Sequence, residues 1–194
     1  VVIDVDTADV TVTHRLGIST INSLFSNEAL TITGGSLVVQ DTANLNSLLT
    51  IAGGSTSFNG LSNITSLQLA GGVLTGTGAF SAEDFIWTGG TYSGSGLTTN
   101  SLEISGPGNK IFSGVLETQG LTEWQSGSIV TGNTASTWNN TATGVWDIQN
   151  NLIFDNVSNN GTIAVIIYVG SLRKSAGDGF ATIEARVIIS GVIV

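Results

Sequence analysis

The sequence predicts an all-β protein, a single-stranded parallel β-helix (β-solenoid) with about 17–24 residues per coil. Three observations predict this fold: a short phrase recurs at nearly constant spacing, apolar and polar residues alternate inside it, and a glycine pair closes it. In each copy of the phrase, the first glycine after the alternating residues lies at position 34, 53, 71, 89 or 106, so the copies follow one another in steps of 19, 18, 18 and 17 residues. A fixed period near 20 residues is typical of a solenoid.

The repeated phrase has the alternation of a half-buried β-strand. It reads Leu-Thr-Ile-Thr-Gly-Gly at 30–35 and returns with changes at 49–54, 67–72, 85–90 and 102–107. Its first and third residues are apolar, so a period of two places them on the inner face. The glycines then allow a positive φ at the corner. A further inward position is expected three residues after the first glycine, at Leu37, Thr56, Leu74 and Tyr92.

Weaker copies of the phrase continue toward the C-terminus. The copy at 122–127 ends on Ser-Gly and the copy at 146–151 ends on Asn-Asn. Asparagine is the next-best residue for a left-handed corner, so we expect the Asn pair to replace the glycines. Ile129 and Ile153 follow these two corners and are expected to point inward.

The remaining residues fit the same architecture. Residues 10–13 alternate without a glycine pair, and turn signals at 159–161, 177–179 and 190–191 separate short apolar runs. No window favours a helix, because Gly, Thr, Ser and Val interrupt each one. One coil cannot bury its apolar face alone, whereas a stack of about ten coils can, so we predict a single domain over 1–194. A β-sandwich is the structural alternative, but it does not explain why one phrase recurs in phase.

The composition excludes several classes of function. Charged residues make up 10% of the 194 residues, and 14 acidic against 5 basic residues give a net charge of −9. Such a surface is unsuited to nucleic acid or to anionic lipid. The absence of cysteine excludes disulfides, thiolate zinc sites and a cysteine nucleophile. No apolar run reaches the length of a transmembrane helix.

Several phrases resemble those of bacterial secreted β-strand-repeat surface proteins, the autotransporter and filamentous-haemagglutinin-like adhesins. The resemblance rests on residues 30–37, 86–96, 154–163 and 172–179, and it covers most of the chain from about residue 10 onward. It implies a right-handed β-helix, an extracellular or cell-surface location, and work as a stalk, adhesin or matrix component. The resemblance supplies no catalytic motif, and host or matrix glycans are the partners that it suggests.

Both ends of the chain are apolar and lack a charged cap, at 1–3 and 187–194. Uncapped strand edges pair with other chains. We therefore expect either a segment of a longer polypeptide or a filament subunit that associates head to tail.

Acidic residues are the main candidates for chemistry, because many parallel β-helices cleave polysaccharides with clustered acids. The candidate pairs are Glu83–Asp84, Asp4–Asp6 and Asp147–Asp155, and Glu103 and Glu123 would stack one coil apart as an outward ladder that could take up Ca²⁺. The simpler interpretation is that these acids keep the rod soluble. His14 could be drawn into a triad with Asp4, Asp6 and Asp9, but no nucleophile elbow exists, so we expect an ordinary outward residue.

Aromatic and threonine side chains suggest two further surfaces. Trp87, Trp124 and Trp146 share the inward position of the phrase and are expected in the core, whereas Trp138 lies off the phrase and is the better candidate for an exposed sugar-stacking residue. Thr11/Thr13 and Thr31/Thr33 fit an ice-binding array, but the next outward pair, at 50 and 52, is Thr and Ala.

These observations favour an extracellular structural or adhesive β-solenoid that is not an enzyme and has no cofactor. The alternative is a polysaccharide-binding or polysaccharide-cleaving β-helix. The third hypothesis is an ice- or mineral-binding solenoid.

Overall fold

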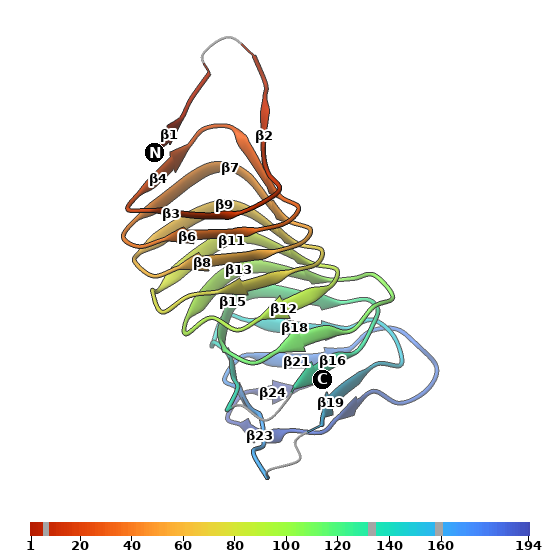
Figure 1. Cartoon of the computed structure of the whole chain (residues 1–194). Coiled ribbons are helices and arrows are strands. Elements are labelled where there is room, and N and C mark those ends of the chain that lie inside the picture. The colour runs from red at the N-terminus through yellow and green to blue at the C-terminus, as the bar shows by residue number, and fades with distance from the viewer. Residues whose placement is uncertain (6–7, 132–134, 158–160) are drawn as a thin grey trace.

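The structure is a computed structural model that describes residues 1–5, 8–131, 135–157 and 161–194. Its regular elements are all strands, and the chain winds through about ten turns stacked along one axis (Figure 1). Neighbouring strands of the stack pair in parallel, as the register of the central strands shows. The predicted fold class, an all-β parallel β-helix, is confirmed. The described ranges contain no helix of the length and hydropathy needed to span a membrane.

Each turn has three faces, which we number in chain order. Five long strands bend and contribute to both the first and the second face: β7 (Ala43–Ile51), β9 (Ser62–Leu69), β11 (Phe80–Trp87), β13 (Leu97–Ile104) and β15 (Val115–Trp124). The first face is completed by β1 (Val2–Ile3), β4 (Leu24–Ser26), β17 (Thr137–Asn140), β20 (Val165–Tyr168) and β23 (Arg186–Ile189). The second face is completed by β2 (Thr11–His14), β5 (Ala29–Ile32), β18 (Val145–Ile148), β21 (Ser171–Lys174) and β24 (Val192–Ile193).

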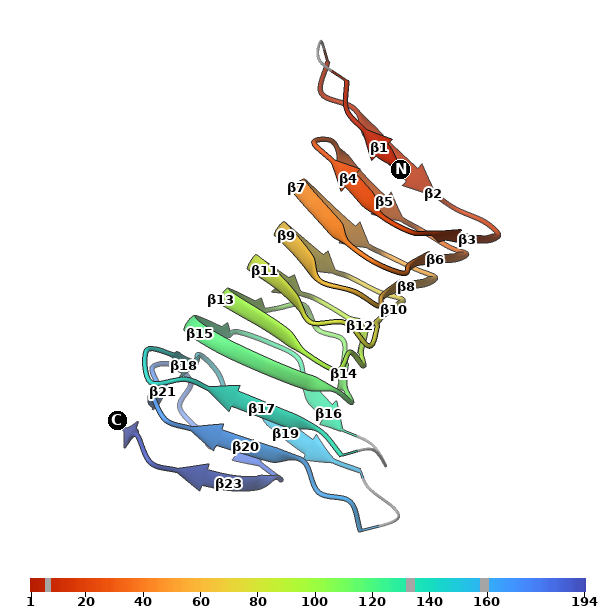
Figure 2. The same cartoon turned by 90° about the vertical axis from the view of Figure 1, so that its left-hand side faces the viewer.

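The third face is a separate sheet of short strands. Figure 2 shows these strands beside the long, bent strands of the other two faces. They are β3 (Ile18–Ile21), β6 (Ser36–Val39), β8 (Ser55–Phe58), β10 (Val73–Thr75), β12 (Gly90–Tyr92), β14 (Lys110–Phe112), β16 (Ile129–Thr131), β19 (Ile153–Asn156) and β22 (Thr182–Ile183).

Glycines form the corner between the second and third faces, as the phrase predicts. Gly54 has φ +65°, and a Cβ added to it would lie 2.4 Å from the carbonyl oxygen of Gly35 in the preceding coil. Gly therefore serves both the backbone conformation and the close approach of stacked coils. The expectation for Asn150 and Asn151 was wrong, since no described residue other than glycine has a positive φ. The corner at 149–153 has one residue more than the preceding corner at 125–128, and the chain turns there without a left-handed residue.

Inward side chains stack in columns and form one continuous core along the axis. The predicted inward residues of the third face are buried and pair in register from Leu37 to Tyr92. Ile129 is also buried as predicted, but Ile153 is 47% exposed. Phe154 pairs with Ile129 in its place, because the extra corner residue shifts the alternation by one position.

Candidate functional site

The acidic residues of the second face form a row along the solenoid axis. Glu103, Glu123, Asp147 and Arg173 occupy the same outward position on β13, β15, β18 and β21. The predicted stacking of Glu103 on Glu123 is confirmed. Parallel in-register pairing thus brings three carboxylates together and ends the row with a guanidinium.

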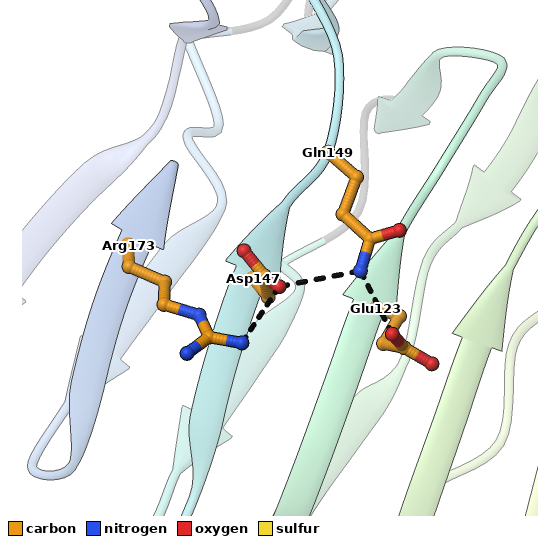
Figure 3. A network of polar contacts seen from close by, with 4 residues as sticks. All are labelled: Glu123, Asp147, Gln149 and Arg173. Carbon is orange, nitrogen blue, oxygen red and sulfur yellow. Dashed lines mark hydrogen bonds and ion pairs between the residues drawn. The ribbon is translucent and has the colours of Figure 1, made fainter. Parts of the chain in front are cut away.

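Hydrogen bonds link the last three members of this row, with Gln149 as a bridge between Glu123 and Asp147 (Figure 3). The Gln149 Nε2 group donates to Glu123 Oε1 at 2.8 Å and to Asp147 Oδ2 at 3.2 Å. The Arg173 Nη2 group donates to the same Asp147 Oδ2 at 2.9 Å. The Gln149 amide and the Arg173 guanidinium therefore offset the repulsion between the carboxylates on neighbouring strands.

Asp147 is held in its charged form. Its side chain is 3% exposed, and burial alone would raise its pKa. Hydrogen bonds from Arg173, Ser175 and Gln149 and the charge of Arg173 outweigh burial, so the pKa of Asp147 lies below its ordinary value. Glycoside hydrolysis needs an acid whose pKa is raised so that it can protonate the leaving group. The environment of Asp147 acts in the opposite direction and suits a contact that joins neighbouring coils.

The other predicted acidic pairs are placed differently. Asp155 lies on the third face, in β19, so the structure does not bring it to Asp147. Asp4 accepts a hydrogen bond from Asn27 Nδ2 at 3.0 Å, and Asp6 lies outside the described residues. Glu83 and Asp84 are exposed at the bend of β11. Among the residues that the structure describes, no three His, Asp or Glu side chains are grouped so that they could hold a metal ion.

His14 lies in the inward column, where it pairs with Ile32, and not on the outward side that we expected. Its coil is the outermost in the stack, so the ring remains half-exposed at the open end. Its Nδ1 lies 3.0 Å from the Gly34 carbonyl oxygen and its Nε2 lies 3.0 Å from Ser19 Oγ. Both ring nitrogens are thus engaged, one by Gly34 of the next coil and one by Ser19 of the same coil, and neither is hydrogen-bonded to an aspartate that the structure describes.

The four tryptophans all lie in the core. Trp87, Trp124 and Trp146 are buried as predicted, but the expected exposure of Trp138 is wrong. Trp138 lies on the first face, stacks on Trp146 at 4.7 Å between ring centroids, and donates from Nε1 to Thr118 Oγ1 at 3.2 Å. The repeated phrase follows the second face, so it carried no information on this inward position. Tyr92 is also buried, and these rings form no exposed sugar-stacking platform.

The threonine column is short. Thr13, Thr31 and Thr50 pair in register on the second face, and Gln68 and Ile86 then continue the same column. The regular array that an ice-binding surface needs is therefore interrupted after three coils.

Sequence reasoning missed Lys110, a fully buried lysine at the start of β14. Its Nζ donates to the carbonyl oxygens of Gly106, Gly108 and Ser126 at 2.6, 3.0 and 3.1 Å. Burial lowers the pKa of Lys110 to about 8. The available signal was the alternation of Lys110 with Phe112, which places both on the inner side of the strand.

Searches with protein-family models, among curated proteins and among solved structures found no match to this chain.

Proposed function

We propose that this chain is a non-catalytic structural β-solenoid of an extracellular surface, where it serves as a stalk, adhesin passenger or fibre subunit. The observation that carries the proposal is the continuous core, in which buried side chains from Leu24 to Tyr168 form a single cluster. Parallel ladders join each coil to the next over the same distance. A solenoid built in this way is a quasi-one-dimensional rod, and its length and stiffness suit mechanical work.

The state of the reactive side chains supports a scaffold over a polysaccharide-cleaving enzyme. Asp147 is neutralised by Arg173, and Lys110 is enclosed by backbone carbonyl oxygens. His14 is engaged by Gly34 and Ser19. The hydrogen bonds of these side chains hold coils and corners together, so we assign the side chains a structural role. The resemblance to bacterial surface proteins supports the extracellular part of the proposal.

Immunogold electron microscopy of the cells that produce the protein tests this proposal. Antibodies raised against the purified chain should label the surface of intact cells, or fibres that project from it. Permeabilised cells are the control, and antibody absorbed with the purified chain shows the background. Labelling that appears only after permeabilisation would contradict an extracellular scaffold.

We also propose that copies of the chain stack end to end. Among the described residues, β24 pairs only with β21 and β2 pairs only with β5, so both outermost coils present strand edges. The edge at β23 and β24 exposes apolar side chains such as Ile189. Charge favours the same arrangement, because residues 1–28 contain four acidic residues and one basic residue, whereas residues 171–194 contain three basic and two acidic residues.

A further inference from the structure

A polar groove lies on the outside of the solenoid where the first face bends into the second. The bend residues that line it are Asn46, Thr65, Glu83, Asn100 and Gln119, one from each of the five long strands. It encloses about 340 Å³, and it extends along the axis across neighbouring coils. We call it the corner groove.

Two single-residue insertions account for the hollow. From Leu45 to Leu48 the strand β7 takes three steps, whereas the paired residues of β9 take two. At the other end β15 also takes one more step than β13. Strands β9, β11 and β13 keep the short bend between them. The long bends of β7 and β15 therefore flank a recess that is three coils long.

Three exposed side chains that line the corner groove, those of Thr65, Glu83 and Asn100, have no hydrogen-bond partner among the residues that the structure describes. One wall is held in place, because Ser81 Oγ donates to Asn63 Oδ1 at 3.1 Å and Asn63 Nδ2 donates to Asn44 Oδ1 at 3.3 Å. The groove thus combines the held amide of Asn63 with exposed donors and acceptors, an arrangement that suits a hydroxyl-rich ligand.

The residues that line the groove restrict the class of ligand that it can bind. None of the described lining residues is basic, and Glu83 is the one carboxylate among them, so the groove disfavours nucleic acid and acidic or sulfated glycans. A peptide strand would need a free sheet edge, whereas the backbones of β9, β11 and β13 are paired on both sides. Stacked strands are about 4.8 Å apart, a rise close to the length of one pyranose unit.

We propose that the corner groove binds a neutral oligosaccharide that lies along the solenoid axis, with Glu83 and Asn100 hydrogen-bonded to its hydroxyl groups. The three short bends span about 10 Å, which accommodates about two sugar units. Recognition depends on hydrogen bonds alone, because the described residues that line the groove include no aromatic ring. The site adds a ligand to the proposed scaffold and does not depend on it.

A glycan array probed with the fluorescently labelled full chain identifies the ligand, and calorimetry then measures its affinity for variants. Thr65→Arg fills the groove and should abolish binding. Glu83→Gln removes the charged acceptor and should weaken binding about tenfold. Asp41→Asn makes the same change of charge at an exposed residue away from the groove and should leave the affinity unchanged. Circular dichroism confirms that each variant is folded.

Binding of neutral glycans that Thr65→Arg abolishes supports the site. The proposal is overturned by the absence of binding to any neutral glycan, by selective binding of acidic glycans, or by binding that Thr65→Arg leaves intact. A negative result would not affect the scaffold role, because that role is tested by the location of the protein on the cell.

Discussion

At the scale of single residues, Lys110 shows how one side chain stabilises an irregular corner. The four preceding corners contain a Gly-Gly pair, whereas the corner before β14 reads Gly-Pro-Gly-Asn at 106–109 and is longer. The Lys110 ammonium donates to two carbonyl oxygens of this corner, those of Gly106 and Gly108, and to that of Ser126 in the corner of the next coil. A lysine, a residue type that is rarely fully buried, therefore completes this turn.

We expect Lys110→Met to lower the free energy of unfolding by about 2–4 kcal/mol, because the carbonyl oxygens of Gly106, Gly108 and Ser126 lose the ammonium that donates to them. Lys174→Met, in which the donors are exposed, is the matched control and should cost far less. Denaturant unfolding of both variants measures the difference. Equal stability of the two variants would contradict this role for Lys110.

The same residue predicts a dependence on pH. The pKa of Lys110 is lowered to about 8 in the folded chain, against 10.5 for an ordinary lysine. Between pH 8 and 10.5 the unfolded chain therefore binds a proton that the folded chain has lost, and the free energy of unfolding rises with pH. Subtracting the curve of Lys110→Met from that of the unchanged chain should isolate this rise. A flat difference over this window would count against the lowered pKa.

At the scale of elements, Trp146 connects strands from all three faces. Its ring centroid lies 5.9 Å from that of Trp124 on the second face, 4.7 Å from Trp138 on the first face and 6.4 Å from Phe154 on the third. Tyr168, in the following coil, lies 5.3 Å away. Aromatic stacking thus fills the cross-section of the solenoid where the coils become longer.

We expect Trp146→Ala to cost about 3–5 kcal/mol of stability, because the surrounding strands cannot close the cavity. Coils of a solenoid contact only their neighbours, so hydrogen exchange should accelerate in β17–β21 and change little in β5–β9. Phe180→Ala, at a side chain that is 93% exposed, provides the control. Uniformly faster exchange along the whole chain would contradict this local effect.

At the scale of the whole molecule, the distribution of charge and apolar edges favours axial association. The first coils are acidic, while Arg173, Lys174 and Arg186 lie in the last coils. Parallel coils repeat in register, so the strand edges at the two ends of the stack have matching hydrogen-bonding patterns. The proposed end-to-end arrangement would extend this pattern from one copy to the next.

We expect the chain to sediment as assemblies that grow with concentration. Ile189→Lys places a charge on the β23 edge and should shift the distribution to monomer. Ile111→Lys introduces the same charge in mid-stack at nearly equal exposure, 45% against 44%, and should not alter assembly. Analytical ultracentrifugation measures both variants. A monomer at every concentration for the unchanged chain would overturn end-to-end stacking.

The repeat by itself determined the architecture and most inward positions of this protein. Alternation and corner glycines at a constant period place residues such as Leu37 and Tyr92 in the core, because parallel in-register stacking repeats the same environment in every coil. The stacking of Glu103 on Glu123 follows from the same periodicity.

The tertiary structure alone decided what happens where the repeat changes length. An inserted residue can lengthen a corner or shift the alternation of a strand, and the local pattern does not distinguish these outcomes. Phe154 therefore replaced Ile153 in the core, and Trp138 proved to be buried. The corner groove arises from insertions in β7 and β15, and its depth depends on three unaltered coils between them. These features depend on the difference in length between neighbouring coils, so the sequence of one coil does not determine them.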